Sequence, residues 1–397
     1  MKTILGFNFS NKTALIRVDF NVPLDASLQV ADNTRILSAK PTILKVLNDG
    51  GSCVLMSHLG RPKGNQANLS LSHIVSEIEK ILDKKVTFAP DCIGAETESI
   101  VNNIKPGDII LLENLRFYSE ETEGDVAFAE KLSKLGQVYV NDAFGSAHRN
   151  HSSTSVITKF FNNKKYLGLL LHKEVLAIEK VLTTGKKPVI AVLGGAKVSS
   201  KITIINNILG KVDEIILGGG MAYTFIKAQG GEVGDSICEY DKLGLAIELL
   251  NKAKANNVIM HLPTDVIAAD SFSNNSNTRE LDIFNIPKGW QGLDIGPNTR
   301  KSFAETIINA KTILWNGPMG VFEMTNFANG TKAVGQAIKT ATKKGAFSLV
   351  GGGDSVSAVK QFGLANDVSY VSTGGGAMLE SLEGKKLPGI AALQQNP

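Results

Sequence analysis

KPVIAVLGGAKVSSKITI, residues 187–204, predicts a strand, a glycine turn and a helix in direct succession. The apolar residues 188–193 form a short continuous run, which is typical of a strand buried on both faces of a parallel sheet. Gly194-Gly195 then turns the chain sharply, because glycine adopts backbone conformations that other residues avoid. From Ala196 onward the sequence predicts the start of a helix.

This arrangement predicts a site for an anion. Glycine lets backbone N–H groups approach a ligand closely, and a helix N-terminus offers unpaired donors. Lys197 and Lys201 are four residues apart, so they would share one face of the expected helix and add positive charge. The alternative is that both lysines are ordinary surface residues beside a strand–helix turn.

Size and composition bound the class of protein. A chain of 397 residues exceeds one ordinary core and predicts two domains, and 39 glycines with 43% hydrophobic residues fit an α/β protein. A net charge of +4 without a Lys/Arg block does not indicate nucleic-acid binding. Three widely spaced cysteines predict neither a disulfide framework nor a zinc site, and no run of 18 apolar residues occurs. We therefore expect a cytoplasmic protein without a membrane segment.

Arginine is used sparingly and unevenly along the chain. Only seven of the 42 basic residues are arginine, and five of these seven precede residue 150. Where lysine meets the general need for charge, arginine is expected at positions that need its fork geometry, in contacts to carboxylate or phosphate. A structural salt bridge is the alternative for any single arginine.

Strands and helices alternate in the first half, which predicts a parallel sheet. Expected helices span 34–48, 72–82 and 125–135, and expected strands include 52–57, 108–112 and 137–141. Polar residues follow the strands, and the carboxyl ends of parallel strands meet at one sheet edge. A strongly positive pocket for a small anionic metabolite is therefore expected there, with Asp19 and Asn21 at the end of the first strand. Its cationic and histidine residues would be Arg17, Arg35, His58, Arg61, Arg116, His148 and Arg149.

The second half repeats glycine turns after its expected strands. Such turns occur at 218–220, 351–353 and 374–376, and together they favour a nucleotide lying over the sheet edge. Any single one could be a loop or a helix stop. Neither GxxxxGK[ST] nor GxGxxG occurs, which argues against a Walker A loop and a dinucleotide fingerprint. The amphipathic segment 167–182 predicts a helix that connects two domains.

Ten distinctive motifs follow one another along nearly the whole chain. They are RVDFNVP at 17–23, SHLGRPKG at 57–64, LENLRF at 112–117, NDAFGSAHR at 141–149, AVLGGAKVSSK at 191–201, GGGMAYTF at 218–225, GLDIGP at 292–297, LWNGPMGVFE at 314–323, GGGDS at 351–355 and STGGGAMLE at 372–380. With these motifs the chain strongly resembles the phosphoglycerate kinase family. The resemblance implies a glycolytic phosphotransferase that moves a phosphoryl group reversibly between 1,3-bisphosphoglycerate and ADP, giving 3-phosphoglycerate and ATP.

The resemblance also implies roles for particular residues. For the 3-phosphoglycerate site these are Asp19, Phe20, Asn21, Arg35, His58, Leu59, Gly60, Arg61, Arg116 and Arg149. For the nucleotide site they are Gly195, Lys197, Lys201, Gly292, Asn316, Glu323, Gly352, Gly353, Asp354 and Ser355. Catalytic roles are implied for Arg35, Lys197 and Gly375. Asp354 is implied as the ligand of the Mg²⁺ ion that is bound with ATP or ADP.

The architecture that the resemblance implies is α/β, with two Rossmann-like domains that are each a mainly parallel sheet flanked by helices. They would be joined by a hinge helix, with a cleft between them. The expected ranges are 1–166 for 3-phosphoglycerate binding, 167–182 for the interdomain helix and 183–376 for nucleotide binding, with a tail at 377–397 that packs back on the first domain. The expected protein is a monomer that binds small-molecule substrates, no nucleic acid and no membrane.

The chemistry explains why these residue types suffice. The acceptor carboxylate is ionised at neutral pH, so catalysis needs in-line positioning and charge stabilisation rather than a general base. Both substrates must shed water, which favours two domains that close. One alternative is a non-catalytic binding protein, which would be expected to lack Arg35, Lys197 or Asp354. The other is a dehydrogenase, which would require the GxGxxG turn.

Overall fold

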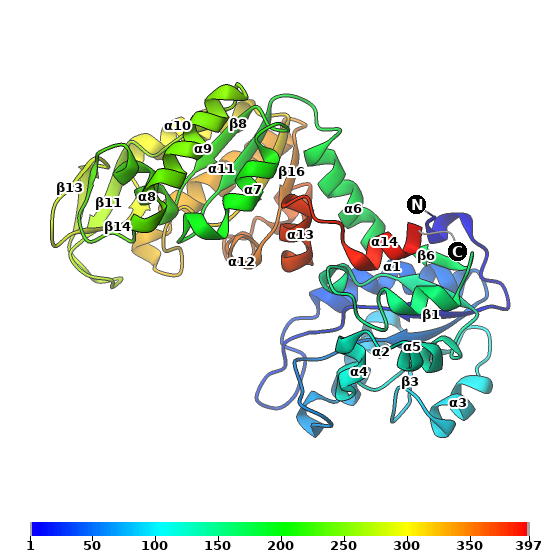
Figure 1. Ribbon diagram of the computed structural model, residues 1–397. Helices are drawn as coiled ribbons and strands as arrows, with labels where there is room; N and C mark the ends of the chain where they lie inside the picture. The colour runs from blue at the N-terminus through cyan, green and yellow to red at the C-terminus, as the bar shows by residue number, and fades with distance from the viewer. Residues whose placement is uncertain (1, 395–397) are drawn as a thin grey trace. The chain divides into compact units, whose positions relative to one another are not determined.

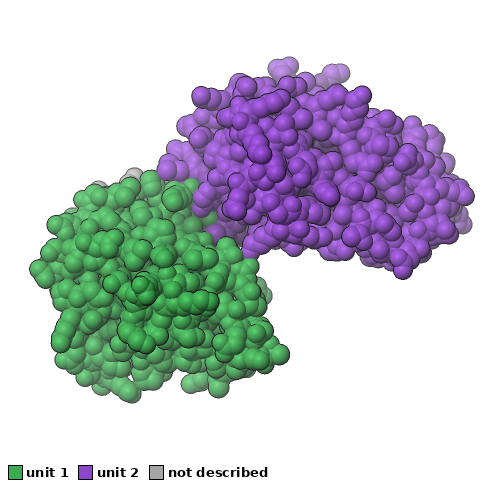
Figure 2. All heavy atoms as spheres, turned by 180° about the vertical axis from the view of Figure 1, so that it is seen from behind, with its two compact units in different colours: residues 1–175, 386–397 green, residues 176–385 purple. Residues whose placement is uncertain are grey.

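The computed structural model describes residues 2–394, and the chain divides into two compact units. Unit 1 runs to Val175 and resumes at Lys386, and unit 2 spans Leu176–Lys385 (Figure 2). The division falls inside helix α6 (Leu169–Leu182), where the sequence predicts the connecting helix. Residues 377–385, which the sequence places in the returning tail, belong to unit 2.

Unit 1 is built on one six-stranded parallel sheet with the strand order β3-β4-β2-β1-β5-β6 (Figure 1). Its strands are β1 (Thr13–Arg17), β2 (Ser52–Met56), β3 (Thr87–Phe88), β4 (Ile109–Leu111), β5 (Val138–Asn141) and β6 (Lys165–Leu167). Its helices are α1 (Thr34–Asn48), α2 (Val75–Leu82), α3 (Ala95–Asn102), α4 (Ser119–Glu123), α5 (Val126–Ser133) and α14 (Pro388–Gln394). The central strands β2, β4 and β5 are buried throughout, as their continuous apolar runs predict.

The three helices predicted for unit 1 lie close to their predicted ranges, whereas α3 and α4 were not predicted. α1 occupies the predicted range 34–48, and Ile36, Ile43 and Val46 bury its apolar face in the sheet core. Asp125 caps α5 by accepting a hydrogen bond from Phe128 N at 2.7 Å. α14 returns the C-terminal segment to unit 1, where Gly389 N donates to the carbonyl of Ala147 at 2.8 Å.

Unit 2 has the same plan with an added antiparallel sheet. Its parallel sheet has the order β10-β8-β7-β15-β16-β17. These strands are β7 (Val189–Leu193), β8 (Glu214–Leu217), β10 (Ile259–His261), β15 (Thr312–Asn316), β16 (Phe347–Val350) and β17 (Tyr370–Val371). Its helices are α7 (Ile202–Ile208), α8 (Met221–Ala228), α9 (Leu243–Ala255), α10 (Pro297–Asn309), α11 (Asn329–Lys343), α12 (Gly353–Gln361) and α13 (Gly375–Leu382). Trp315 is fully buried in the core of this unit, so it serves packing.

The antiparallel sheet of unit 2 was not predicted from the sequence. It has the strand order β12-β11-β14 and consists of β11 (Asp265–Ala269), β12 (Thr278–Asp282) and β14 (Gln291–Ile295). β9 (Glu232–Val233) and β13 (Asn285–Ile286) pair with each other and form a separate two-stranded parallel sheet. The antiparallel sheet carries Gly292, one of the expected nucleotide contacts.

In both sheets the strand order reverses beside the first strand of the unit. β1 lies between β2 and the later strand β5, and β7 lies between β8 and the later strand β15. At such a reversal the connections leave in opposite directions, which opens a crevice at the carboxyl ends of the strands where ligands bind. The fold therefore provides one candidate site in each unit.

The predicted helix start at Ala196 is wrong. Lys197 has an extended backbone (φ −132°, ψ 136°), residues 198–200 form a 3₁₀ turn, and α7 begins only at Ile202. Hydrogen bonds of two serines hold the turn that precedes the helix, one of them local and the other to a distant segment. Ser200 Oγ donates to Lys197 O at 2.7 Å, and Glu239 accepts both N–H and O–H from Ser199. Lys197 and Lys201 therefore do not share a helix face.

Candidate active site

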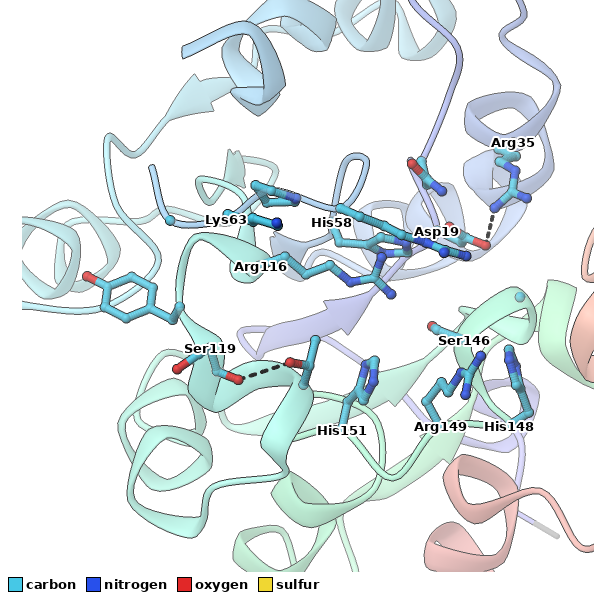
Figure 3. A pocket seen from close by; sticks show the side chains of 17 residues that line it. Asp19, Arg35, His58, Lys63, Arg116, Ser119, Ser146, His148, Arg149 and His151 are labelled. Carbon is cyan, nitrogen blue, oxygen red and sulfur yellow. Dashed lines mark hydrogen bonds and ion pairs between the residues drawn. The ribbon is translucent and has the colours of Figure 1, made fainter. Parts of the chain in front are cut away.

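A cavity of about 560 Å³ lies at the carboxyl end of the unit 1 sheet (Figure 3). The loops that follow β1, β2, β4 and β5, together with the start of α1, supply its walls. In Figure 3 the side chains of Arg149 and His151 lie across the cavity from His58 and Asp19. Its charged and histidine lining residues are Asp19, Arg35, His58, Arg61, Lys63, Arg116, His148, Arg149 and His151.

The cavity is strongly cationic. Four arginines and Lys63 line it, and Asp19 is the one carboxylate among the lining residues. Arg35 forms an ion pair with Asp19, and Arg116 Nη1 donates to Gly60 O at 2.9 Å. Burial, with the charge of Arg17, lowers the pKa of Arg116 to about 10, so this guanidinium remains charged at neutral pH. The excess of positive charge suits a ligand with several negative charges.

In the part of the chain that the structure describes, some buried side-chain atoms of residues that line this cavity lack a hydrogen-bond partner. Asp19 Oδ1 and Arg116 Nε are buried, and within residues 2–394 neither has a hydrogen-bond partner. A buried donor or acceptor without a partner carries a free-energy cost, which a ligand with matching groups would remove. One is an acceptor and the other a donor, so the site suits a ligand that carries both a hydroxyl group and an anionic group.

Two histidines of the cavity, His58 and His151, contribute hydrogen bonding rather than charge. Burial and the charge of Arg17 hold the pKa of His58 well below its usual range. Burial, followed by the charge of Arg116, lowers the pKa of His151 to about 4. Both imidazoles are therefore neutral at pH 7, and the positive charge of the cavity comes from arginine and lysine.

The structure brings most of the predicted acceptor-site residues together. The lining includes Asp19, Asn21, Arg35, His58, Arg61, Arg116 and Arg149. Phe20 and Leu59 do not line the cavity but lie in the apolar core beneath it. The backbone N–H of Gly60 donates to Asn21 Oδ1 at 2.8 Å, and this hydrogen bond holds Gly60 beside the cavity.

One expected member of the pocket is elsewhere, and others were missed. Arg17 is fully buried, and its guanidinium is bound to protein groups, so its expected place in the pocket wall is wrong. Lys63, Ser146 and His151 line the cavity but were not predicted as site residues. Their proximity in sequence to Arg61 and Arg149, on the same loops, was the signal that could have found them.

A second group of predicted residues lies at the carboxyl edge of the unit 2 sheet. Lys201 Nζ donates to Asn316 Oδ1, and Asn316 Nδ2 donates to Gly351 O at 2.6 Å. Gly195 N donates to Pro318 O at 3.1 Å, in a turn where Gly195 has φ +114°. The loops that follow β7, β15 and β16 are therefore joined here by hydrogen bonds.

Close approach requires glycine at position 352 of this edge, but not at position 375. Gly352 has φ +94°, and a Cβ there would collide with the side-chain amide of Asn316. Gly375, at the start of α13, packs against the backbone of Gly352 and Gly353, with its Cβ position 3.7 Å from Gly352 Cα. α12 begins at Gly353, which places Asp354 in its first turn as an exposed carboxylate.

The remaining nucleotide-site predictions are distributed over separate segments of unit 2. Ser355 Oγ is buried and accepts a hydrogen bond from Gly317 N at 2.5 Å. Gly292 lies on β14 against the hydroxyl of Tyr223, and its N–H donates to Ser236 Oγ at 2.9 Å. Lys197 and Glu323 are exposed on the loops that follow β7 and β15. Burial lowers the pKa of Lys201, and the nearby charge of Asp354 opposes this shift.

Known proteins are similar to this chain in sequence over nearly their full length. The family model described as phosphoglycerate kinase matches residues 4–385. The chain belongs to the phosphoglycerate kinase family. It is 50% identical to the phosphoglycerate kinase of Porphyromonas gingivalis over 99% of this chain and 100% of that relative. It is 51% identical to that of Chloroherpeton thalassium, over 99% of this chain and 98% of the relative.

Solved phosphoglycerate kinases have the same fold. The structure from Coxiella burnetii is 39% identical, with a TM-score of 0.91 over 99% of this chain and 98% of that one. The structure from Pyrococcus horikoshii is 30% identical, with a TM-score of 0.83 over the same shares. These likenesses confirm the predicted α/β fold of parallel sheets flanked by helices. Membership of the family confirms the predicted activity, glycolytic phosphoryl transfer between 1,3-bisphosphoglycerate and ADP.

Proposed function

We propose that the cationic cavity of unit 1 binds 3-phosphoglycerate and 1,3-bisphosphoglycerate, and that the glycine turns of unit 2 bind ADP and ATP. The observation that carries this assignment is the cavity lining, in which four arginines and Lys63 surround one carboxylate. A small acid that carries both carboxylate and phosphate groups matches this charge.

The cavity offers distinct groups to the two ends of this substrate. Arg61, Arg116 and Arg149, with neutral His58, would hold the 3-phosphate through charge-assisted hydrogen bonds. Asp19 and Asn21 would bind the hydroxyl and carboxylate end, and the unpartnered Asp19 Oδ1 supports this role. Phe20, Leu59 and Gly60 would support these side chains from beneath, through packing and backbone contacts.

The edge of the unit 2 sheet suits a nucleotide. Gly195, Lys201 and Asn316 would contact its phosphates, with the backbone of Gly352 and Gly353 beside them. Gly292 and Glu323 would contact the nucleoside, Glu323 through the ribose hydroxyls. Ser355 would act mainly through the hydrogen bond that holds the Gly317 turn.

Asp354 fits a magnesium ion that is bound together with the nucleotide. Magnesium usually takes one or two carboxylates and completes its coordination with substrate phosphates and water. Asp354 is an exposed carboxylate beside Lys201, and no cluster of three or more potential metal-ligating side chains exists in the described chain. Magnesium would neutralise part of the negative charge of the nucleotide phosphates, and lysine would neutralise another part.

The residues of the chain would act by positioning and by charge. The attacking group is an ionised carboxylate, so no proton has to be removed before transfer. Arg35 and Lys197, both partly or fully exposed, would stabilise charge on the transferring phosphoryl oxygens, and Gly375 would keep the backbone near the phosphates open. Direct in-line transfer requires the two substrates to meet, so closure about the hinge helix α6 belongs to this proposal.

The proposal extends to the localisation, oligomeric state and partners of the enzyme. Within residues 2–394, no helix combines the length and the apolar character needed to cross a membrane. We propose a cytoplasmic monomer whose partners are its small-molecule substrates, with neither nucleic acid nor a membrane involved.

The proposal is tested by measuring phosphoryl transfer with purified protein, MgATP and 3-phosphoglycerate, coupled to consumption of the acyl phosphate. Turnover should require both substrates and magnesium, and should fall by two or more orders of magnitude in Asp354→Ala, as loss of a group that stabilises the transition state predicts. Asp241→Ala removes another exposed carboxylate of unit 2 and should retain activity. Equal activity of the two variants would contradict the assignment of Asp354.

A further inference from the structure

Arg17 lies buried behind the wall of the acceptor cavity. It is the last residue of β1, and its side chain has no exposed surface. Its Nε donates to Ser153 Oγ at 2.8 Å, its Nη1 donates to Val18 O, and its Nη2 lies 3.1 Å from His58 Nδ1. The guanidinium therefore contacts the ring of a cavity residue without reaching the cavity itself.

This contact decides which nitrogen of His58 carries the proton. A guanidinium has only donors, so His58 Nδ1 must accept the hydrogen bond through its lone pair. A neutral imidazole whose Nδ1 accepts carries its hydrogen on Nε2. Among residues 2–394 no protein group occupies His58 Nε2, and His58 lines the cavity. Nε2–H is thus the donor that the ring can offer to a ligand.

A buried carboxylate balances the charge of Arg17. Glu121 Oε1 lies 4.0 Å from Arg17 Nη2, and both side chains are fully buried. Ser153 bridges them, because its Oγ donates to Glu121 Oε1 at 2.6 Å while it accepts from Arg17 Nε. Ser153 N also donates to Glu121 Oε2 at 2.9 Å. The Ser153 hydroxyl has one hydrogen, which it donates to Glu121, so it can only accept from Arg17 Nε. Arg17 in turn donates to His58 Nδ1, and the direction of every hydrogen bond from Glu121 to His58 is therefore fixed.

We propose that Arg17 is a positioning residue that holds His58 as an uncharged Nε2–H donor for the anionic group of the acceptor substrate. This inference rests on the proposed acceptor site for the identity of the ligand, but not for the state of the ring. The opposite tautomer would present a lone pair to an anion and repel it. Arg17 thereby acts on the ligand through His58, although it does not touch the ligand.

The state of the ring can be measured directly by nitrogen-15 NMR of the histidines at pH 7 without ligand, with His58 assigned from a His58→Gln variant. Wild type should show the Nε2–H tautomer. Arg17→Met combined with Glu121→Gln removes both buried charges together, which avoids leaving one unpaired. This double variant should show a mixture of tautomers, whereas Glu121→Gln alone, which keeps Arg17, should not. A wild-type Nδ1–H tautomer, or no change in the double variant, would overturn the proposal.

Kinetics then separates positioning from general damage to the fold. The Arg17→Met/Glu121→Gln enzyme should have a KM for 3-phosphoglycerate that is raised roughly tenfold, with kcat within about twofold, because one ligand hydrogen bond is impaired. In a His58→Gln background the same pair of changes should add no further effect on KM, because the ring through which Arg17 acts is gone. An equal increase in both backgrounds would show that Arg17 does not act through His58.

The two measurements also separate this inference from the proposed function. If the wild-type protein failed to bind 3-phosphoglycerate, the acceptor-site assignment would fall while the NMR result still decided the tautomer. If the protein binds and turns over normally but His58 carries its proton on Nδ1, the role of Arg17 is excluded and the proposed function stands.

Discussion

Arg35 illustrates how a single residue can be held ready for a ligand. Its guanidinium is paired with Asp19, and 33% of its side chain is exposed, against 8% for Asp19. Partly exposed ion pairs contribute little net free energy, so exchanging Asp19 for an anionic group of a ligand costs little. Arg35 can therefore exchange Asp19 for a ligand anion, as its proposed role in phosphoryl transfer requires.

Arg35→Ala should bind both substrates nearly normally, because the remaining arginines and Lys63 still supply the charge of the cavity. Its kcat should fall by roughly two to three orders of magnitude, as for loss of a group that stabilises charge in the transition state. Steady-state kinetics with both substrates varied measures the two effects separately. Arg279→Ala is the matched control, since Arg279 stacks on Trp290 in unit 2. Unchanged turnover in Arg35→Ala would remove Arg35 from catalysis.

At the scale of elements, the N-terminus of α6 is tied to two elements that bear on the acceptor site. Asp142 Oδ1 accepts from Leu170 N at 2.9 Å and Leu171 N at 3.1 Å, and it directly follows β5. Leu169 N donates to Thr42 Oγ1 at 2.8 Å, and Thr42 lies on α1, whose first turn carries Arg35. A carboxylate at this helix end also interacts favourably with the helix dipole.

Asp142 should make stability depend on pH. Burial raises its pKa to about 7 from the ordinary 3.8. Between these values the native state holds a proton that the unfolded chain has released, so the contribution of this group to the free energy of unfolding falls as pH rises from about 4 to about 7. Relative to Asp142→Asn, wild type should therefore lose up to about 4 kcal/mol across this range.

Urea unfolding at several pH values measures this difference. Asp125→Asn, which alters the cap of α5 in the same unit, is the control and should show no comparable change with pH. A difference between wild type and Asp142→Asn that is independent of pH would contradict a raised pKa at this buried site.

At the scale of the whole molecule, two α/β units each carry one candidate site at the reversal of strand order in their parallel sheets. The reaction couples the two, because the phosphoryl group passes directly between substrates that these units are proposed to bind. Water must be excluded during transfer, since the acyl phosphate and ATP both hydrolyse.

We expect the radius of gyration in solution to decrease when 3-phosphoglycerate and a magnesium nucleotide are bound together. Either ligand alone should have a smaller effect, because it occupies a single unit. Small-angle X-ray scattering with each ligand and with both measures this change. An unchanged radius under conditions of full turnover would rule out closure as part of the mechanism.

Much of this organisation was predictable from local sequence. The helix over 34–48, the buried strands and the convergence of arginines at one sheet edge follow from apolar periodicity and from the geometry of parallel sheets. β12 was missed because its sequence, TRELD, is charged and largely exposed and shows no apolar alternation. The helix start near Lys197 was misplaced because Glu239, 40 residues away from Ser199, holds the preceding turn.

The sequence by itself determined the family, the two parallel sheets and the class of reaction, because these depend on long ordered motifs and on patterns that act within a few residues. The tertiary structure decided which of the arginines face the ligand. Arg17 and Arg61 look alike in sequence, yet one is buried against Glu121 and Ser153 and the other lines the cavity. Burial and partners come from segments more than a hundred residues apart, and local patterns carry no information about such contacts.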